Sequence, residues 1–196
     1  MVRHLPFLFL ASKGFAGDDM CILESERLIL RPPRPADIAA MVVWLGDYNV
    51  SQNLARVPFP YDEQDAEAFV AGVGREAETY VFSVLRSSDG LFLGGIGLHP
   101  DAEGFEFGYW LGKPFWGQGY ATEAAHRLVR FGFEELGLET VRGSRFADNP
   151  ASGHVLAKLG ARHNGSRMRD SRARGSKVLC HEMLLTRADF LRKRAA

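Results

Sequence analysis

Short apolar runs dominate the first half of the chain, and a longer apolar pattern of helical period appears in the second half. The turn Ser87-Ser88-Asp89-Gly90 separates two such runs by a few polar residues, which is typical of an antiparallel hairpin. The apolar runs predict strands at 23–32, 80–86, 91–98, 105–111, 140–146 and 178–186.

Helical period is clearest where Ala124, Leu128 and Val129 recur on one face of a predicted helix that ends at Gly137. Hairpins followed by a strand–helix–strand unit predict an α/β protein of the α+β type, with a mixed, mostly antiparallel sheet of about seven strands and about four helices. Neither a repeat nor a linker divides the chain, so we expect one domain over residues 20–196. The predicted helices cover 36–45, 61–78, 122–136 and 151–159.

The two ends of the sequence follow neither pattern. The run from Leu5 to Ala11 resembles the core of a signal sequence, but it contains Pro6 and no cleavage site of small residues follows it. We therefore expect residues 1–19 to form a flexible tail, with translation from Met20 as the alternative. A polar, basic tail is expected after the last strand.

Composition narrows the class of protein. The 196 residues are 46% hydrophobic, and 24 Lys and Arg balance 24 Asp and Glu, so global charge gives no argument for nucleic acid or an acidic membrane surface. Cys21 and Cys180 form neither a CxxC pair nor a disulfide framework, which favours a reducing compartment and a cytoplasmic location. Because no apolar run approaches the roughly 20 residues of a spanning helix, and no metal ligands stand at usable spacing, neither membrane nor metal is expected.

A glycine-rich turn joins the strand that ends at Leu111 to the amphipathic helix. Gly117, Gly119 and Ala121 keep side chains away from the first N–H groups of that helix, which lack internal partners and favour an anion. A Rossmann fingerprint would need a small residue where Thr122 stands, and the Gly-Lys-Ser/Thr of a Walker loop is absent. The turn therefore predicts a phosphate site of another kind, or a glycine turn that only packs the helix on the sheet.

Two segments carry a resemblance to a known family. The turn reads Trp116-Gly-Gln-Gly119-Tyr-Ala121, and a later helix follows Asn149-Pro-Ala-Ser152. The first segment resembles the cofactor loop of the GNAT acetyltransferases, with Trp116 in place of the usual Arg or Gln, and the second resembles that family's Asn and Ser. The sequence around the turn resembles the branch of this family that contains the ribosomal-protein alanine N-acetyltransferases. The resemblance covers about residues 22–190.

The resemblance implies a single-domain GNAT fold in which two neighbouring parallel strands, 105–111 and 140–146, splay apart around acetyl-CoA. It implies acetyl-CoA as co-substrate and no metal. The implied contacts are Trp110 and Leu111 for the pantetheine arm and acetyl carbonyl, the backbone of Gly117, Gln118, Gly119, Tyr120, Ala121 and Thr122 for the pyrophosphate, and Asn149 for the pantetheine or phosphates.

Acetyl transfer needs a neutral amine, a stabilised oxyanion and a proton for the leaving thiolate. Glu106, which lies between two Phe residues, is the candidate base, and its alternative role is that of an exposed ion-pair partner of Arg or Lys on an edge strand. Ser152 is the candidate acid or hydrogen-bond donor to the sulfur, and its alternative role is helix capping. Many relatives place a Tyr seven residues after the Asn, where this chain has Leu156.

We therefore expect an N-acetyltransferase, a monomer or homodimer, that transfers acetyl by direct attack of a primary amine in a ternary complex. The acceptor is a peptide N-terminus or a small molecule, and the segment Tyr48–Tyr61 is expected to form a loop at the mouth of its site. The missing Tyr keeps open a non-catalytic acyl-CoA sensor of the same fold. The segment 162–177 has six Arg or Lys and one Asp, which indicates either a solvated hairpin or, less simply, an RNA contact.

Overall fold

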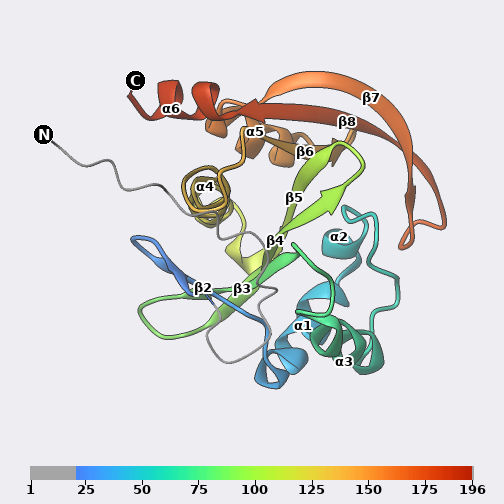
Figure 1. Ribbon diagram of the computed structural model, residues 1–196. Coiled ribbons are helices and arrows are strands. Elements are labelled where there is room, and N and C mark those ends of the chain that lie inside the picture. Colours follow the sequence, from blue (N-terminus) through green and yellow to red (C-terminus); the bar gives the residue numbers. More distant parts are fainter. Residues whose placement is uncertain (1–20, 196) are drawn as a thin grey trace, which may run out of the picture.

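The computed structural model describes residues 21–195, and within that range the strands form one sheet with helices on both faces (Figure 1). The expected N-terminal tail, residues 1–19, lies outside the described residues. The strands are β1 (Leu23–Glu24), β2 (Leu28–Arg31), β3 (Tyr80–Arg86), β4 (Phe92–Asp101), β5 (Gly104–Leu111), β6 (Thr140–Phe146), β7 (Arg162–Ser171) and β8 (Ser176–Thr186). Their order across the sheet is β1-β2-β3-β4-β5-β6-β8-β7.

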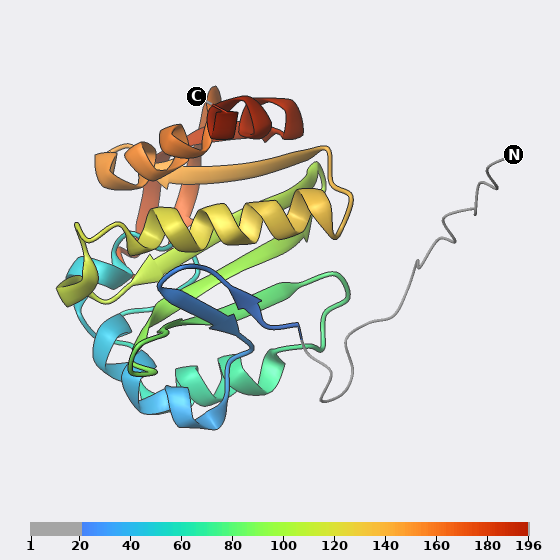
Figure 2. The same ribbon diagram turned by 90° about the vertical axis from the view of Figure 1, so that its left-hand side faces the viewer.

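The helices divide between the two faces of this sheet. α4 (Tyr120–Glu134), α5 (Pro150–Leu159) and α6 (Arg187–Ala195) cover one face, while α1 (Ile38–Leu45), α2 (Tyr48–Ser51) and α3 (Glu63–Gly72) cover the other (Figures 1 and 2). Short 3₁₀ turns, Pro35–Asp37 and Lys113–Phe115, precede α1 and follow β5. The larger core lies under α4 and α5, and a smaller one lies under α1 to α3.

Successive side chains of β5 point to opposite faces of the sheet. Phe107, Tyr109 and Leu111 pack with the core under α4, while Trp110 packs with the core under α1 to α3. Glu106 alternates with Phe107 and therefore shares the face of Trp110.

The parallel pair β5–β6 is joined over only two register positions, Glu106 opposite Arg142 and Phe107 opposite Gly143. Beyond Phe107 the two strands separate. A Cβ on Gly143 would lie 2.6 Å from Leu156 Cδ2 and 2.8 Å from Phe107 Cε1, so only glycine allows α5 to pack this closely where the pairing ends. The splayed parallel pair expected from the sequence is thus present.

The predicted fold class is confirmed, although the counts differ: the described residues form eight strands and six α-helices instead of about seven and four. The expected strand 23–32 is two short strands, β1 and β2, paired with each other. The expected mouth loop contains the helix α2, because Asp47 accepts a hydrogen bond from the backbone N–H of Asn49 and caps it.

The expected polar tail after β8 is wrong, because the chain continues as helix α6. Thr186 and Asp189 bond reciprocally at its start: the backbone N–H of Asp189 donates to Thr186 Oγ1 at 3.1 Å, and that hydroxyl donates to Asp189 Oδ2 at 3.0 Å. Phe190 is 1% exposed and packs against His126 and Phe133 of α4. A capping pair and one buried ring therefore order a segment that is otherwise basic.

Among the described residues, no helix combines the length and the apolar character that crossing a membrane would require. That part of the chain also contains no group of three or more His, Cys, Asp or Glu side chains placed to hold a metal ion.

Candidate active site

The turn before α4 leaves its helix N-terminus open. Gly117 and Gly119 have φ angles of 74° and 86°, in the left-handed region that favours glycine, and Gly119 is the N-cap of α4 with no side-chain capping bond. A Cβ placed on Gly117 would meet no atom within 4 Å. Backbone N–H groups of the first helical turn are thus uncovered beside open space, an arrangement that fits a phosphate group.

Hydrogen bonds among Ser25, Arg27 and Glu123 stabilise this turn. Glu123 Oε1 accepts hydrogen bonds from Ser25 Oγ at 2.8 Å and from the backbone N–H of Arg27 at 2.7 Å, and Arg27 Nε donates to Glu123 Oε2 at 2.7 Å. Burial opposes ionisation, but these donors lower the pKa of Glu123. Arg27 Nη1 also donates to the carbonyl of Gln118 at 3.1 Å. Arg27 immediately precedes β2, so the approach of β2 to the turn brings its guanidinium to Glu123.

Two side chains of the turn fold back onto its own backbone. Trp116 Nε1 donates to the carbonyl of Leu111 at 2.8 Å, and Gln118 Nε2 donates to the carbonyl of Pro114 at 2.7 Å. Trp116, which stands where the family has Arg or Gln, therefore ties the end of β5 to the turn.

A cavity of about 890 Å³ passes through the gap between β5 and β6. It is lined by residues of both faces, so it connects the turn before α4 with the space under α1 to α3. Of the residues expected to contact the co-substrate, all but Gln118 line it: Trp110, Leu111, Gly117, Gly119, Tyr120, Ala121, Thr122 and Asn149. Both candidate catalytic residues, Glu106 and Ser152, also line it.

On the α4–α5 face, Asn149 and Ser152 are engaged in helix capping. Asn149 Oδ1 accepts a hydrogen bond from the backbone N–H of Ser152 at 3.1 Å, which starts α5. Burial raises the pKa of Tyr109, and the nearby Ser152 side chain acts on that pKa in the opposite direction. Leu156, where relatives have Tyr, is 1% exposed and packs against Gly143.

Tyr109 was missed at the sequence level. Its position in the strand could have indicated it. Tyr109 stands two residues beyond Phe107, the last residue of β5 that pairs with β6, and it shares the face of Phe107. Tyr109 therefore carries a hydroxyl into the gap near the helix that lacks one at position 156.

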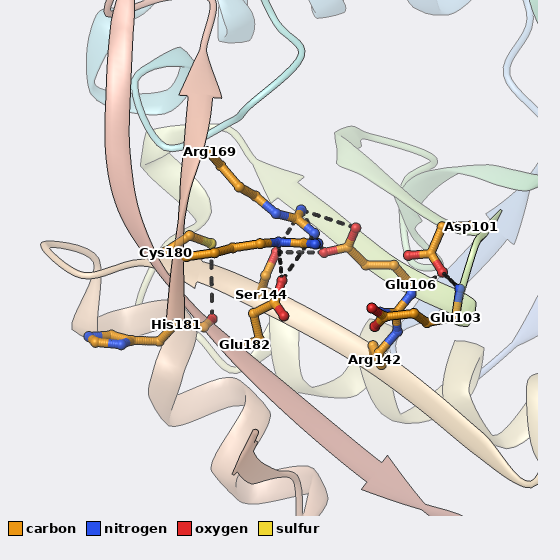
Figure 3. A network of polar contacts seen from close by, with 10 residues as sticks. Asp101, Glu103, Glu106, Arg142, Ser144, Arg169, Cys180, His181 and Glu182 are labelled. Carbon is orange, nitrogen blue, oxygen red and sulfur yellow. Dashed lines mark hydrogen bonds and ion pairs between the residues drawn. The ribbon is translucent and has the colours of Figure 1, made fainter. Parts of the chain in front are cut away.

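On the opposite face, Glu106 has close partners (Figure 3). Ser144 Oγ donates to Glu106 Oε1 at 2.6 Å, and Arg169 Nη1 donates to the two carboxylate oxygens at 2.8 and 3.1 Å. The side chains of Arg169 and Glu106 are 21% and 17% exposed. The arginine partner considered as the alternative for Glu106 is therefore present, although the pair is half-buried on a central strand and not exposed on an edge.

His99 is the neighbour of Glu106 on β4 and was also missed at the sequence level. The register of β4 and β5 places the two residues directly opposite each other. A Cβ on Gly97 would lie 3.1 Å from His99 Nε2, so the imidazole lies back over Gly97 on the cavity wall. Burial, with help from the charge of Arg56, lowers the pKa of His99, while Glu106 and Glu76 oppose the shift.

The hairpin β7–β8 reaches the segment that follows α2, as its long curve in Figure 1 shows. The backbone N–H of Arg172 donates to the carbonyl of Ala55 at 3.0 Å, and Arg174 Nε donates to the carbonyl of Gln52 at 2.8 Å. The basic charge of this segment is largely paired within the protein, through Arg162–Asp189, Arg167–Glu182, Arg169–Glu106 and Arg174–Asp148. Among the described residues, Arg172 and Lys177 are the two basic side chains of the segment outside these ion pairs.

A sheet parted at one parallel pair, with an open helix N-terminus on one face and a polar pocket on the other, is the arrangement of a transferase that joins two substrates. The sequence model of the Acetyltransferase (GNAT) domain matches residues 27–162, and the chain belongs to this family of acetyltransferase enzymes.

Known proteins of this family resemble the chain in sequence and in structure. The chain is 30% identical to the uncharacterised N-acetyltransferase YnaD of Bacillus subtilis over 149 residues, 73% of this chain and 84% of that protein. It is 48% identical to FsC-acetyl coenzyme A-N(2)-transacetylase of Aspergillus fumigatus over 58 residues, which cover 30% of this chain and only 25% of that protein. The structure of Mycobacterium smegmatis RimJ in complex with CoA-disulfide superposes with a TM-score of 0.73 at 20% identity, over 87% of this chain and 88% of that one.

Proposed function

We propose that the protein transfers the acetyl group of acetyl-CoA to a primary amine, with a peptide N-terminus as the leading acceptor class. One observation carries the proposal. The cavity runs through the gap between β5 and β6 and joins the uncovered N-terminus of α4 to the pocket beside Glu106. Such a passage lets two substrates meet at one reacting bond from opposite faces of the sheet.

Acetyl-CoA would enter from the α4–α5 face. Its pyrophosphate would rest on the backbone N–H groups around Gly117 to Thr122, where the glycines and the helix dipole leave room and favour negative charge. The backbone of β5 at Trp110 and Leu111, on the edge that β6 no longer pairs, would hold the pantetheine arm and the acetyl carbonyl, with Asn149 on the same cavity wall. The capping bond uses Asn149 Oδ1, which leaves the amide N–H₂ as a donor to the co-substrate.

The leaving thiolate would receive its proton from the pair formed by Tyr109 and Ser152. Leu156 is buried and supplies no polar atom, whereas the Tyr109 hydroxyl lies in the cavity wall with Ser152 as its partner. Because the pKa of Tyr109 is raised, its hydroxyl stays protonated across the neutral range and can donate. Ser152, the acid expected from the sequence, would then hold and re-protonate Tyr109 or donate to the sulfur itself.

The acceptor amine would enter between α1 to α3 and the β7–β8 hairpin. An α-amino group has a pKa of about 7.7–8.0, so an appreciable fraction is neutral and nucleophilic near pH 7. The negative charge of Glu106 faces this side and favours the approach of an amine. The resemblance to the ribosomal-protein alanine N-acetyltransferases supports a peptide N-terminus as the acceptor.

Release of free thiol from acetyl-CoA, measured against N-terminal peptides, polyamines, amino acids and aminoglycosides, tests the proposal. We expect saturable, amine-dependent release that is fastest with one class of N-terminal peptide. Saturable coenzyme A binding without amine-stimulated release by any acceptor would instead support the non-catalytic sensor of the same fold.

A further inference from the structure

The carboxylate of Glu106 is already committed to protein donors. Oε1 accepts from Ser144 Oγ at 2.6 Å and from Arg169 at 2.8 Å, while Oε2 accepts from Arg169 at 3.1 Å. Charge-assisted hydrogen bonds to a carboxylate are short and strong. An amine giving up a proton would have to compete with these protein donors for either oxygen of Glu106.

His99 is placed to take that proton instead. It stands opposite Glu106 in the β4–β5 register, and both side chains line the acceptor side of the cavity. Its ring lies over Gly97, and the residue is half-buried. No hydrogen bond to a protein group engages its ring nitrogens among the described residues.

We propose that His99 is the proton acceptor for the attacking amine, an assignment that rests on the acetyl transfer proposed above. The amine nitrogen forms a bond to the acetyl carbonyl carbon, and the bond from that carbon to sulfur breaks. One N–H proton of the amine passes to the neutral imidazole of His99, and the electron pair of the broken bond leaves on the thiolate. The thiolate takes a proton from Tyr109, which regains one from solvent, and His99 releases its proton to solvent, so that both groups are restored.

Glu106 then has a positioning role. Its negative charge, fixed by Arg169 and Ser144, stands across the strand from the imidazolium that forms when His99 accepts the proton. The negative charge of Glu106 favours the charged imidazole and raises the pKa of His99, and Glu76 acts in the same direction. Arg56 acts in the opposite direction and keeps His99 neutral before the reaction.

The pH dependence follows from these four groups. Because burial and Arg56 lower the pKa of His99, the imidazole is neutral and able to accept a proton down to below the ordinary histidine pKa of about 6.5. We expect kcat at saturating amine to fall on the acid side, with a midpoint below about pH 6.5. Removing the positive charge in Arg56→Gln should raise that midpoint by a few tenths of a pH unit.

The central variant is His99→Gln, which keeps a polar side chain but cannot accept a proton near neutrality. We expect kcat to fall at least about 100-fold, with loss of the acid limb and with coenzyme A affinity within about twofold of wild type. Added imidazole should restore part of the rate to His99→Ala. The matched control is His163→Gln, an exposed histidine of β7, whose kcat and pH profile should stay those of wild type.

Three outcomes overturn the inference. His99→Gln could retain kcat and the acid limb, or the wild-type limb could stay in place in Arg56→Gln. In either case His99 is not the proton acceptor, while acetyl transfer itself stands because the wild type turns over. Absence of thiol release from the wild type with every amine would overturn both proposals. If His99→Gln fails to fold, the Arg56→Gln midpoint still decides the question, since that exposed side chain lies outside the core.

Discussion

The indole Nε1 of Trp116 donates a hydrogen bond to the carbonyl oxygen of Leu111, with 2.8 Å between the two atoms. This bond joins the last residue of β5 to the turn that opens α4. It fixes the distance between the backbone proposed to hold the pantetheine arm and the N–H groups proposed to hold the pyrophosphate. Trp116 is 44% exposed, so it does not act as a core residue.

Replacing this donor should loosen the co-substrate site. In Trp116→Phe we expect a loss of about 1 kcal/mol in coenzyme A binding, or roughly a fivefold higher Kd by calorimetry. Trp44→Phe is the matched control, because Trp44 Nε1 is buried without a hydrogen-bond partner in the described part of the chain. The role assigned to the Trp116–Leu111 bond is wrong if both variants bind coenzyme A as the wild type does.

A side chain at Gly117 should block the phosphate seat. Gly117→Glu places a carboxylate in the open space before α4, so we expect no measurable coenzyme A binding, through steric block and repulsion. Gly137→Glu is the control, because Gly137 has a similar φ of 70°, equally open surroundings and a place beyond the far end of α4. Both variants carry the same backbone strain. Equal coenzyme A affinity in the two variants would move the phosphates away from this turn.

The Tyr109–Ser152 pair makes a prediction about the thiolate. In Tyr109→Phe we expect kcat to fall by about 10- to 100-fold, with little change in coenzyme A affinity, because the ring is kept and only the proton donor is lost. Ser152→Ala should cost less, and the double variant should be no slower than Tyr109→Phe. Additive losses in the double variant would indicate that the two hydroxyls act independently.

A buried ion pair under α1 should make stability depend on pH. Asp37 is 3% exposed and accepts from both terminal nitrogens of Arg31, at 2.7 and 2.8 Å, and from Ser83 Oγ at 2.7 Å. Burial alone would raise the pKa of Asp37, but these bonds and the backbone N–H of Arg34 outweigh it and lower the pKa. A lowered folded-state pKa contributes stability above the unfolded-state pKa of about 3.9, and acid removes it as pH falls through the folded-state value.

Chemical denaturation across pH checks this account. Asp37→Asn should lower the free energy of unfolding by about 3–5 kcal/mol at pH 7, because Arg31 is left buried without its counter-charge. The stability of this variant should also change less below pH 4. Asp89→Asn, which breaks an exposed pair with Arg86, should change the free energy of unfolding far less than Asp37→Asn does. A similar small loss in both variants would contradict the structural role of Asp37.

Local signals made much of the co-substrate side predictable from the sequence. The left-handed glycines before α4, the cap at Asn149 and the amphipathic stripe of α4 each act within a few residues of the chain. Such short-range chemistry leaves a readable pattern. The same holds for the hairpin of β3 and β4. The start of α6 also carries a local pattern, the Thr186–Asp189 capping pair, although we expected a polar tail there.

The acceptor side could not be predicted in the same way, because its contacts join distant parts of the chain. Arg169 reaches Glu106 across 63 positions, and no spacing rule indicates that pair. His99 meets Glu106 only through the register of β4 on β5, and a shift of one residue would leave the two side chains on opposite faces of the sheet. Tyr109 depended on knowing where β5 and β6 stop pairing.

The contacts of the β7–β8 hairpin with residues 52–55 have a consequence for how the protein is made. Arg174 reaches the carbonyl of Gln52 across 122 positions. During synthesis the turn before α4 and helix α5 leave the ribosome before this hairpin does. A nascent chain therefore contains the turn before α4 and helix α5, which we propose to bind the co-substrate, before it contains the β7–β8 hairpin. Ribosome-bound intermediates halted near residue 160 lack that hairpin altogether.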